Sequence, residues 1–296
     1  MTTIYQNDTL NTMEMENIEL KYLPELEAPL LIAGFEGWGN ALEVSRGMIN
    51  YLIQKLEAKE FGRIKAEPFY SFESKRPTVE IKDGIVKGIA HPSTFLYVIG
   101  KEQAGRDLIL LKGIEPSMQW FQYTDCILSL CKKLGVQTLV SIGGMYDHIL
   151  HTDTIISVVA SDENLLESLK EKKAYTITYK GLSSIHSTLH AEAKKQGFRC
   201  VAMYCHCPYY LQGTTHFGLL SYAGDFLADW AGFSLDTDDL AVSWKSISKQ
   251  IQDEIDKNPE LQNMVNDIRK AKIQGVLESA PKYDNVIQLQ DFFKPR

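Results

Sequence analysis

Short apolar runs alternate with stretches of helical periodicity along the chain, and this alternation predicts the fold. Residues 29–33, 107–113 and 138–144 are almost continuously apolar and stop at or beside glycine, as strands buried on both faces do. Apolar residues at steps of three and four follow in residues 41–56 and 118–134, which predicts helices there. Because strands alternate with crossover helices, we predict an α/β fold of three α/β/α layers around a mixed, mostly parallel sheet.

The same pattern predicts further elements around this core. A strand is expected at residues 63–70, and a hairpin around Asp83-Gly84 is expected to add antiparallel pairing beside the parallel core. We also predict strands at 155–160, 174–179 and 198–204, and helices at 162–172, 183–196 and 219–231.

Changes of periodicity divide the chain into four parts. We predict a flexible leader at 1–20 with an edge strand near 18–22, an α/β domain at 21–236, a helical extension at 237–280 and a tail at 281–296. The breaker Asn258-Pro259 splits the extension into a C-terminal helical hairpin of residues 238–257 and 259–277.

Composition and charge narrow the classes of function. The 296 residues are 44% hydrophobic and 23% charged, which is enough to build a large core. A net charge of -7 and a pI of 5.6 disfavour nucleic-acid and membrane partners. We find neither a membrane-length apolar run nor a signal-like start, and the five cysteines are irregularly spaced, so we expect a cytoplasmic protein with reduced thiols.

A glycine-rich turn joins the first buried strand to the first helix. It reads Gly34-Phe35-Glu36-Gly37-Trp38-Gly39-Asn40, with Asn40 placed to cap the helix. Backbone N–H groups at such a turn can hold an anion, but the turn has no phosphate-loop lysine, and Glu36 opposes an anion there. A tight connection is the alternative interpretation.

Other candidate residues follow strand ends, where open α/β sheets bind ligands. Glu36 and Glu115 are expected to face one crevice as polar anchors or as an acid and base, or else to hold loops through backbone N–H groups. The predicted crevice consists of Gly34, Glu36, Gly37, Trp38, Asn40, Glu115, Trp120, Gly143, Gly144, Asp147, His151 and Thr152. No nucleophile with a clear base accompanies them, so we assign no catalytic residue.

Three histidine motifs are weak candidates for metal binding. His148 and His151 share a loop, and His186 and His190 share a helix face, but neither pair has an identifiable third ligand. In Cys205-His206-Cys207 the strand pleat sends the imidazole away from the two thiols. We therefore predict no metal and no cofactor.

Several motifs, taken in order, resemble the PAC2 family, which includes proteasome assembly chaperones. These motifs are Gly34-Phe35-Glu36-Gly37-Trp38, residues 67–72 with Arg76-Pro77, residues 113–116 with Trp120, and Leu134-Gly135-Val136 with Gly143-Gly144 and His151-Thr152. The match runs along residues 29–155 and more weakly to residue 240. The resemblance implies a phosphorylase/hydrolase-like α/β/α fold, a homo-oligomer, and a helical C-terminal extension as in bacterial members.

The chain also departs from the family pattern at two places. The second glycine-rich turn usually contains Gly-Pro, whereas residues 179–185 here contain Gly181 without a following proline. Assembly factors that dock on proteasome pockets often end in a hydrophobic residue, tyrosine and any residue, whereas this chain ends Phe293-Lys294-Pro295-Arg296. Tail insertion of that kind is therefore not expected.

The resemblance and the missing catalytic set lead to one expected function and one alternative. We expect a non-enzymatic oligomeric assembly chaperone or scaffold that binds a protein partner, itself or both. The alternative is a small-ligand-binding protein or an enzyme, either hydrolase/phosphorylase-like or ATP-dependent, that uses the crevice at the strand ends.

Overall fold

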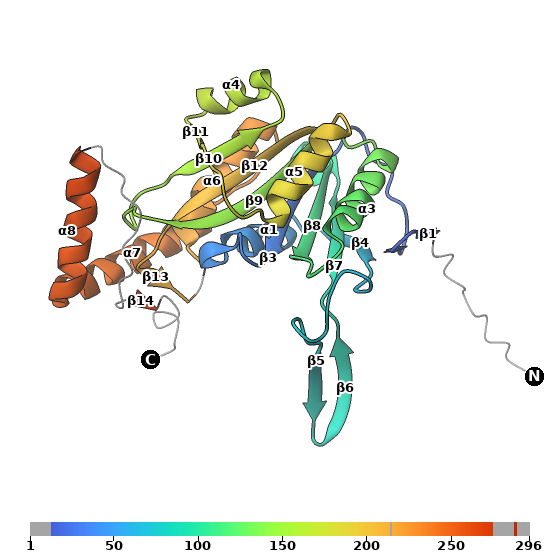
Figure 1. Ribbon diagram of the computed structural model, residues 1–296, viewed down its shortest axis with the longest axis horizontal. Coiled ribbons are helices and arrows are strands. Elements are labelled where there is room, and N and C mark those ends of the chain that lie inside the picture. The colour runs from blue at the N-terminus through green and yellow to red at the C-terminus, as the bar shows by residue number, and fades with distance from the viewer. Residues whose placement is uncertain (1–12, 214, 275–286, 289–296) are drawn as a thin grey trace, which may run out of the picture.

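One large mixed sheet forms the centre of the molecule (Figure 1). The computed structural model describes residues 13–213, 215–274 and 287–288. The sheet strands are β1 Met13–Met15, β2 Ile18–Leu20, β3 Leu30–Glu36, β4 Lys59–Ile64, β7 Thr94–Ile99, β8 Leu108–Ile114, β9 Thr138–Asp147, β10 Ile156–Ala160, β11 Tyr175–Thr176 and β12 Arg199–Pro208. Within the described residues their order is β1-β2-β4-β7-β8-β3-β9-β12-β10-β11.

Parallel pairing is concentrated in the middle of this sheet. β8, β3, β9 and β12 run parallel to one another, and Ile32 of β3 lies beside Leu110 on one side and Val140 on the other. The flanking pairs are antiparallel, except that β11 runs parallel to β10 at the edge. The central strands are buried on both faces, which explains their continuous apolar sequences. The predicted mixed sheet is confirmed.

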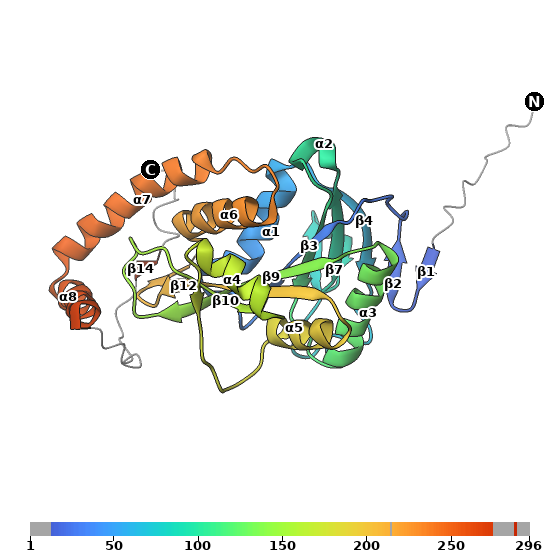
Figure 2. The same cartoon turned by 90° about the horizontal axis from the view of Figure 1, so that it is seen from above.

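Helices cover both faces of the sheet and complete the predicted three layers (Figure 2). The helices are η1 Ala41–Glu43, α1 Val44–Lys55, α2 Lys101–Ala104, α3 Trp120–Lys133, α4 Glu163–Glu171, α5 Ile185–Lys195, α6 Phe217–Ala231, α7 Asp238–Lys257 and α8 Pro259–Gln274. α1, α4 and α6 share one apolar core with alternate strand residues, and α3 and α5 share the other. No helix among the described residues is long and apolar enough to cross a membrane.

The C-terminal helical hairpin, α7 followed by α8, is present as predicted. α7 packs along α6 and buries Ile247, Ile251 and Ile255. At its start, Trp244 stacks on His216 with ring centroids 3.7 Å apart. Within the predicted tail, β14 Ile287–Gln288 pairs with β13 Leu211–Gln212; the remainder of the predicted tail and residues 1–12 of the predicted leader lie outside the described residues.

A second hairpin projects away from the body of the molecule (Figure 1). β5 Thr78–Lys82 and β6 Ile85–Ala90 form their own two-stranded sheet, and every residue in both strands is exposed. Asp83 and Gly84 have φ of 52° and 73°, as the favoured Asp-Gly hairpin turn requires. The predicted hairpin is confirmed, but its expected position beside the parallel core is wrong. We call residues 78–90 the arm.

Two further predictions need correction. The strand predicted at residues 63–70 ends at Ile64, because Phe69 and Tyr70 both donate a backbone hydrogen bond to Ala66 and so form a turn. Their apolar side chains are buried in the core without belonging to a strand. β7 was not predicted, although it supplies the antiparallel neighbour of β8. β11 has only two of the six residues expected at 174–179.

Candidate functional site

The glycine turn after β3 is held in place by one carboxylate. Glu115, directly after β8, accepts a hydrogen bond from the Trp38 backbone N–H at 3.1 Å through Oε2. Its Oε1 accepts from the Ile185 N–H at 2.8 Å, at the start of α5, where the helix dipole favours a negative charge. Gly37 has φ of 147°, and a Cβ there would lie 2.7 Å from the Glu115 Cβ. Glu115 therefore joins the turn to the α5 N-terminus.

Glu36 has a different partner. Its Oε2 lies 3.1 Å from Nη1 of Arg46, and the two side chains are 43% and 42% exposed. The Asn40 side chain accepts a hydrogen bond from the Arg46 N–H at 3.1 Å, in the first turn of α1. The predicted cap at Asn40 is wrong, because α1 begins three residues later than expected and Glu43 is its N-cap. The structure thus engages Glu36 and Glu115 in separate contacts rather than pairing them as an acid and base.

The glycines of the predicted crevice allow close approach between elements. The Gly144 N–H donates to the Gly39 carbonyl at 2.7 Å, and a Cβ on Gly144 would lie 2.6 Å from the Ala41 carbonyl oxygen. Gly34 lets α1 lie against β3, and Gly143 faces the ring of Tyr204. A packing requirement therefore accounts for these residues.

Large apolar side chains are exposed beside this turn. Trp38 is 61% exposed, and Met118 and Phe121, after the end of β8, are 43% and 70% exposed. Trp120 instead donates its Nε1–H to the Pro116 carbonyl at 2.7 Å. The carboxyl edge of the sheet therefore presents apolar surface to solvent.

Asp147 belongs to a hydrogen-bonded chain that crosses three strands. Its Oδ2 lies 2.6 Å from His206 Nδ1, and His206 Nε2 lies 2.7 Å from Ser157 Oγ. The bond from His206 is the main cause that holds the pKa of the Asp147 carboxyl below its usual range. Asp147 was predicted as a site residue, whereas Ser157 and the role of His206 were not. The predicted pleat was the available signal, because it places His206 opposite the buried Cys205 and Cys207.

His151 and Thr152 lie in the loop that follows β9, and neither belongs to the hydrogen-bonded chain of Asp147. The His151 ring Nδ1 lies 2.9 Å from the Tyr210 hydroxyl, and burial lowers the pKa of His151 to about 4. Thr152 is exposed, and Asp153 pairs with Lys272 of α8 at 2.8 Å. The loop that carries this part of the predicted crevice therefore contacts the helical extension.

The remaining histidine motifs are packed rather than arranged as ligands. His186 lies edge-on to Phe35 at 5.2 Å, and neither ring nitrogen has a hydrogen-bond partner in the described residues. Burial lowers the pKa of His186 to about 4. No group of three or more His, Cys, Asp and Glu side chains in the described part of the chain is placed to hold a metal ion.

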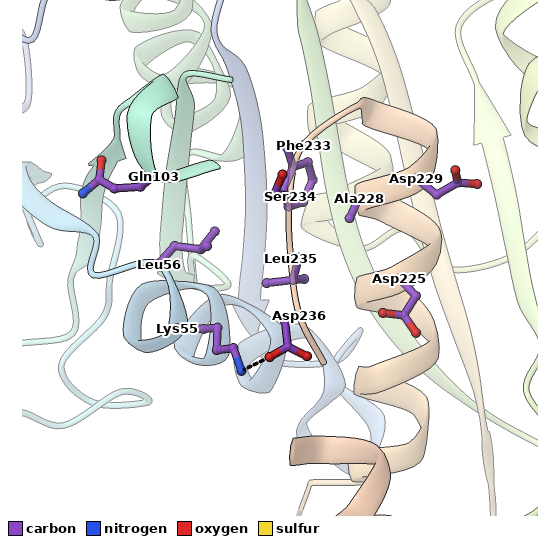
Figure 3. A pocket seen from close by; sticks show the side chains of 10 residues that line it. All are labelled: Lys55, Leu56, Gln103, Asp225, Ala228, Asp229, Phe233, Ser234, Leu235 and Asp236. Carbon is purple, nitrogen blue, oxygen red and sulfur yellow. Dashed lines mark hydrogen bonds and ion pairs between the residues drawn. The ribbon is translucent and has the colours of Figure 1, made fainter. Parts of the chain in front are cut away.

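A surface pocket of about 650 Å³ lies elsewhere, between the end of α1 and the segment after α6 (Figure 3). Its lining residues are Lys55, Leu56, Gln103, Asp225, Ala228, Asp229, Phe233, Ser234, Leu235 and Asp236. The ion pair between Lys55 and Asp236 crosses it at 3.1 Å. None of the predicted crevice residues lines this pocket.

Comparison with known proteins agrees with the fold. The chain is 26% identical to a PAC2 family protein from Streptomyces avermitilis, with a TM-score of 0.70, covering 80% of this chain and 99% of that one. A proteasome-assembly chaperone homologue from Mycobacterium tuberculosis is 22% identical, with a TM-score of 0.72 and coverage of 80% and 99%. An archaeal proteasome activator from Pyrococcus furiosus is 18% identical, with a TM-score of 0.61 and coverage of 81% and 98%.

Sequence family assignment is more direct. No curated protein matches the chain. The PAC2 family model matches residues 31–255, which include the glycine turn, Glu115 and the Asp147 loop. Because that match covers well over half of the sequence, this chain belongs to the PAC2 family.

Proposed function

We propose that this protein is an oligomeric assembly chaperone or scaffold that acts by binding proteins. Two structurally similar proteins are described as a proteasome-assembly chaperone homologue and an archaeal proteasome activator, which supports a chaperone-like role for the family. The observation that carries the proposal is the arm, because its exposed apolar face is suited to a protein partner. We expect the protein to work in the cytoplasm, without nucleic acid or membrane.

The arm has one apolar face. Val79 pairs across the strands with Ile89, and Ile81 with Val86, and these four side chains are 54–60% exposed. Glu80 and Lys82 alternate with them on β5 and so point to the other face. A two-stranded hairpin in water is marginally stable unless it packs on another element. The apolar face is therefore the part of the arm that a partner would cover.

The carboxyl edge extends this surface toward the body. Thr94, the first residue of β7 and the fourth after the arm, bonds to the Tyr123 hydroxyl of α3 at 2.5 Å, so the chain leaves the arm next to α3. Trp38, Met118 and Phe121 are exposed at the same edge. These surfaces also suit self-association. In a two-fold symmetric dimer, the arm and the apolar edge of each protomer would both be buried.

A paired substitution on the arm tests the proposal. Ile81→Glu combined with Val86→Lys removes apolar surface but keeps an opposite-charge pair across the strands, so the hairpin should persist. We expect the wild type to recover a defined protein from native lysate or to form a stable oligomer, and the variant to lose that binding at least tenfold. Quantitative pull-down and light scattering of the purified protein measure the two outcomes.

Lys82→Gln is the matched control, because it changes the other face of the same hairpin. It should bind as the wild type does. The proposal fails if the wild type is a monomer that recovers no defined protein, or if the paired variant binds as well as the control.

A further inference from the structure

We propose that Ser157, His206 and Asp147 form a nucleophile site that takes small carboxylic esters or other activated acyl groups. The three side chains come from the neighbouring strands β10, β12 and β9 and lie on one face of the sheet. The Ser157 Oγ to His206 Nε2 distance is 2.7 Å, and the His206 Nδ1 to Asp147 Oδ2 distance is 2.6 Å. A nucleophile, a base and a carboxylate that orients the base are thus joined in the order that acyl transfer requires.

The direction of the hydrogen bonds follows from the Asp147 carboxylate. An ionised carboxylate can only accept, and its second oxygen accepts the His148 N–H at 2.7 Å. His206 must therefore donate from Nδ1, which leaves the lone pair of Nε2 facing the Ser157 hydroxyl. This tautomer is the one that can remove the proton from serine.

The polar chain runs from the surface to a buried end. The Asp147 side chain is 28% exposed and that of His206 is 11% exposed, whereas Ser157 is 1% exposed. A second buried serine on this face lacks such a chain. Ser141 of β9 is also buried, and its hydroxyl has no hydrogen-bond partner in the described residues. Satisfying a hydroxyl does not by itself explain a histidine and a carboxylate.

Access to Ser157 depends on the edge of the sheet. Tyr204 and Tyr175 are its register partners on either side, so the three residues lie on one face of the sheet, and the Tyr204 ring packs toward Gly143 of β9. Tyr175 is 60% exposed, and β11 is held to β10 by two residue pairs at the sheet edge. We infer that a ligand reaches Ser157 when Tyr175 turns away or β11 separates.

Separation of β11 also supplies a donor. His206 donates its backbone N–H to Ile155, so residues 155 and 157 face β12, and the N–H of Val158 faces β11. Without β11 this N–H has no strand partner and is available to the oxygen of a substrate carbonyl. The residue after the nucleophile contributes such a donor in other acyl-transfer sites.

The reaction balances without a cofactor. Ser157 Oγ forms a bond to the acyl carbon while its proton moves to His206 Nε2. The bond from the acyl carbon to the leaving oxygen breaks, and that oxygen takes the proton from His206. Water then repeats the sequence and releases the acid. Tyr175, beside Ser157 at the sheet edge, favours a small acyl group with an aromatic or apolar leaving group.

A small fluorophosphonate tests the site in the intact protein. Ser157 Oγ would bond to phosphorus, fluoride would leave, and His206 would take the proton. We expect one label per folded chain, mapped by peptide mass spectrometry to Ser157, and none after unfolding in guanidinium. Ser157→Ala should lose the label, and Ser141→Ala should keep it. A folded wild type that shows no label at Ser157 overturns the proposal, whether or not a variant folds.

Asp147→Asn tests the positioning role of the carboxylate. The amide can donate to His206 and so favours the wrong tautomer, which should slow labelling by roughly 10³- to 10⁴-fold while the melting temperature stays close to that of Ser141→Ala. Hydrolysis of p-nitrophenyl acetate should fall in parallel. Labelling at an unchanged rate in Asp147→Asn overturns the proposal, because the chain from Asp147 to Ser157 would then add nothing to serine reactivity.

Discussion

The carboxyl edge of the sheet and the arm use their residues in opposite ways. At the edge, Glu115 binds two backbone N–H groups and Gly144 packs against the Ala41 carbonyl. On the arm, every residue of β5 and β6 is exposed, and the large apolar side chains are 54–60% exposed. Glu115 and Gly144 thus have a role in holding the fold together, whereas packing does not explain the apolar side chains of the arm.

The comparison first predicts a large loss of stability at the edge. Glu115→Ala leaves the N–H groups of Trp38 and Ile185 without their carboxylate and removes a negative charge from the α5 N-terminus. Because the side chain is half-buried and water can replace part of the interaction, we expect the free energy of unfolding to fall by about 2 to 3 kcal/mol. Urea denaturation of the purified protein measures this loss.

Glu36→Ala is the matched control for Glu115→Ala. Glu36 pairs with Arg46 at the surface, and both side chains are more than two-fifths exposed. Exposed ion pairs contribute about 0 to 1 kcal/mol, so the control should change stability by less than that. Equal losses in the two variants would show that Glu115 does not hold the edge together.

A second effect on stability appears only at low pH, because His186 is buried just behind the glycine turn. Burial lowers the pKa of His186 to about 4, so the folded protein keeps it neutral while the unfolded chain protonates it below about 6.5. Its contribution to stability is therefore complete above pH 6.5 and is lost as the pH falls toward 4, by up to about 1.4 kcal/mol per pH unit. His186→Leu should flatten the pH dependence of the free energy of unfolding by that amount.

His91 provides the control for this pH dependence, because it is exposed at the base of the arm. Denaturation curves between pH 7 and pH 4.5 should have the same pH slope in His91→Asn as in the wild type. If His186→Leu also leaves the slope unchanged, the His186 ring is not held neutral by burial.

Much of the fold could be predicted because its signals are local. The buried strands β3, β8 and β9 appear as continuous apolar runs, and Asp83-Gly84 predicts the hairpin turn of the arm. The residues after Ile64 have the composition of a strand but do not form one. Phe69 and Tyr70 are apolar because they are buried in the core, which the sequence pattern does not distinguish from a buried strand. The position of the arm could not be predicted, since a hairpin turn fixes pairing within a hairpin but not what its faces contact.

The candidate site was less predictable because its partners are distant in sequence. Glu115 was expected at the carboxyl edge, but Ile185, which it contacts, is 70 residues away. Ser157 and His206 meet only because β10 and β12 are neighbours, and strand order follows from the whole topology. The strand pleat predicts that His206 lies on the face opposite Cys205 and Cys207. No local sequence pattern predicts that Ser157 and Asp147 are its hydrogen-bond partners.

The smallest expected effect on stability belongs to the arm. Replacing residues 78–90 by a short glycine-serine linker removes a two-stranded sheet that pairs only with itself in the described residues. Because every residue of the removed strands is exposed, we expect the free energy of unfolding to change by no more than about 0.5 kcal/mol, as for surface substitutions. Denaturation at low protein concentration measures this value without self-association. A loss comparable to that of Glu115→Ala would mean that the arm packs on its own body, and the contrast between arm and edge would then no longer hold.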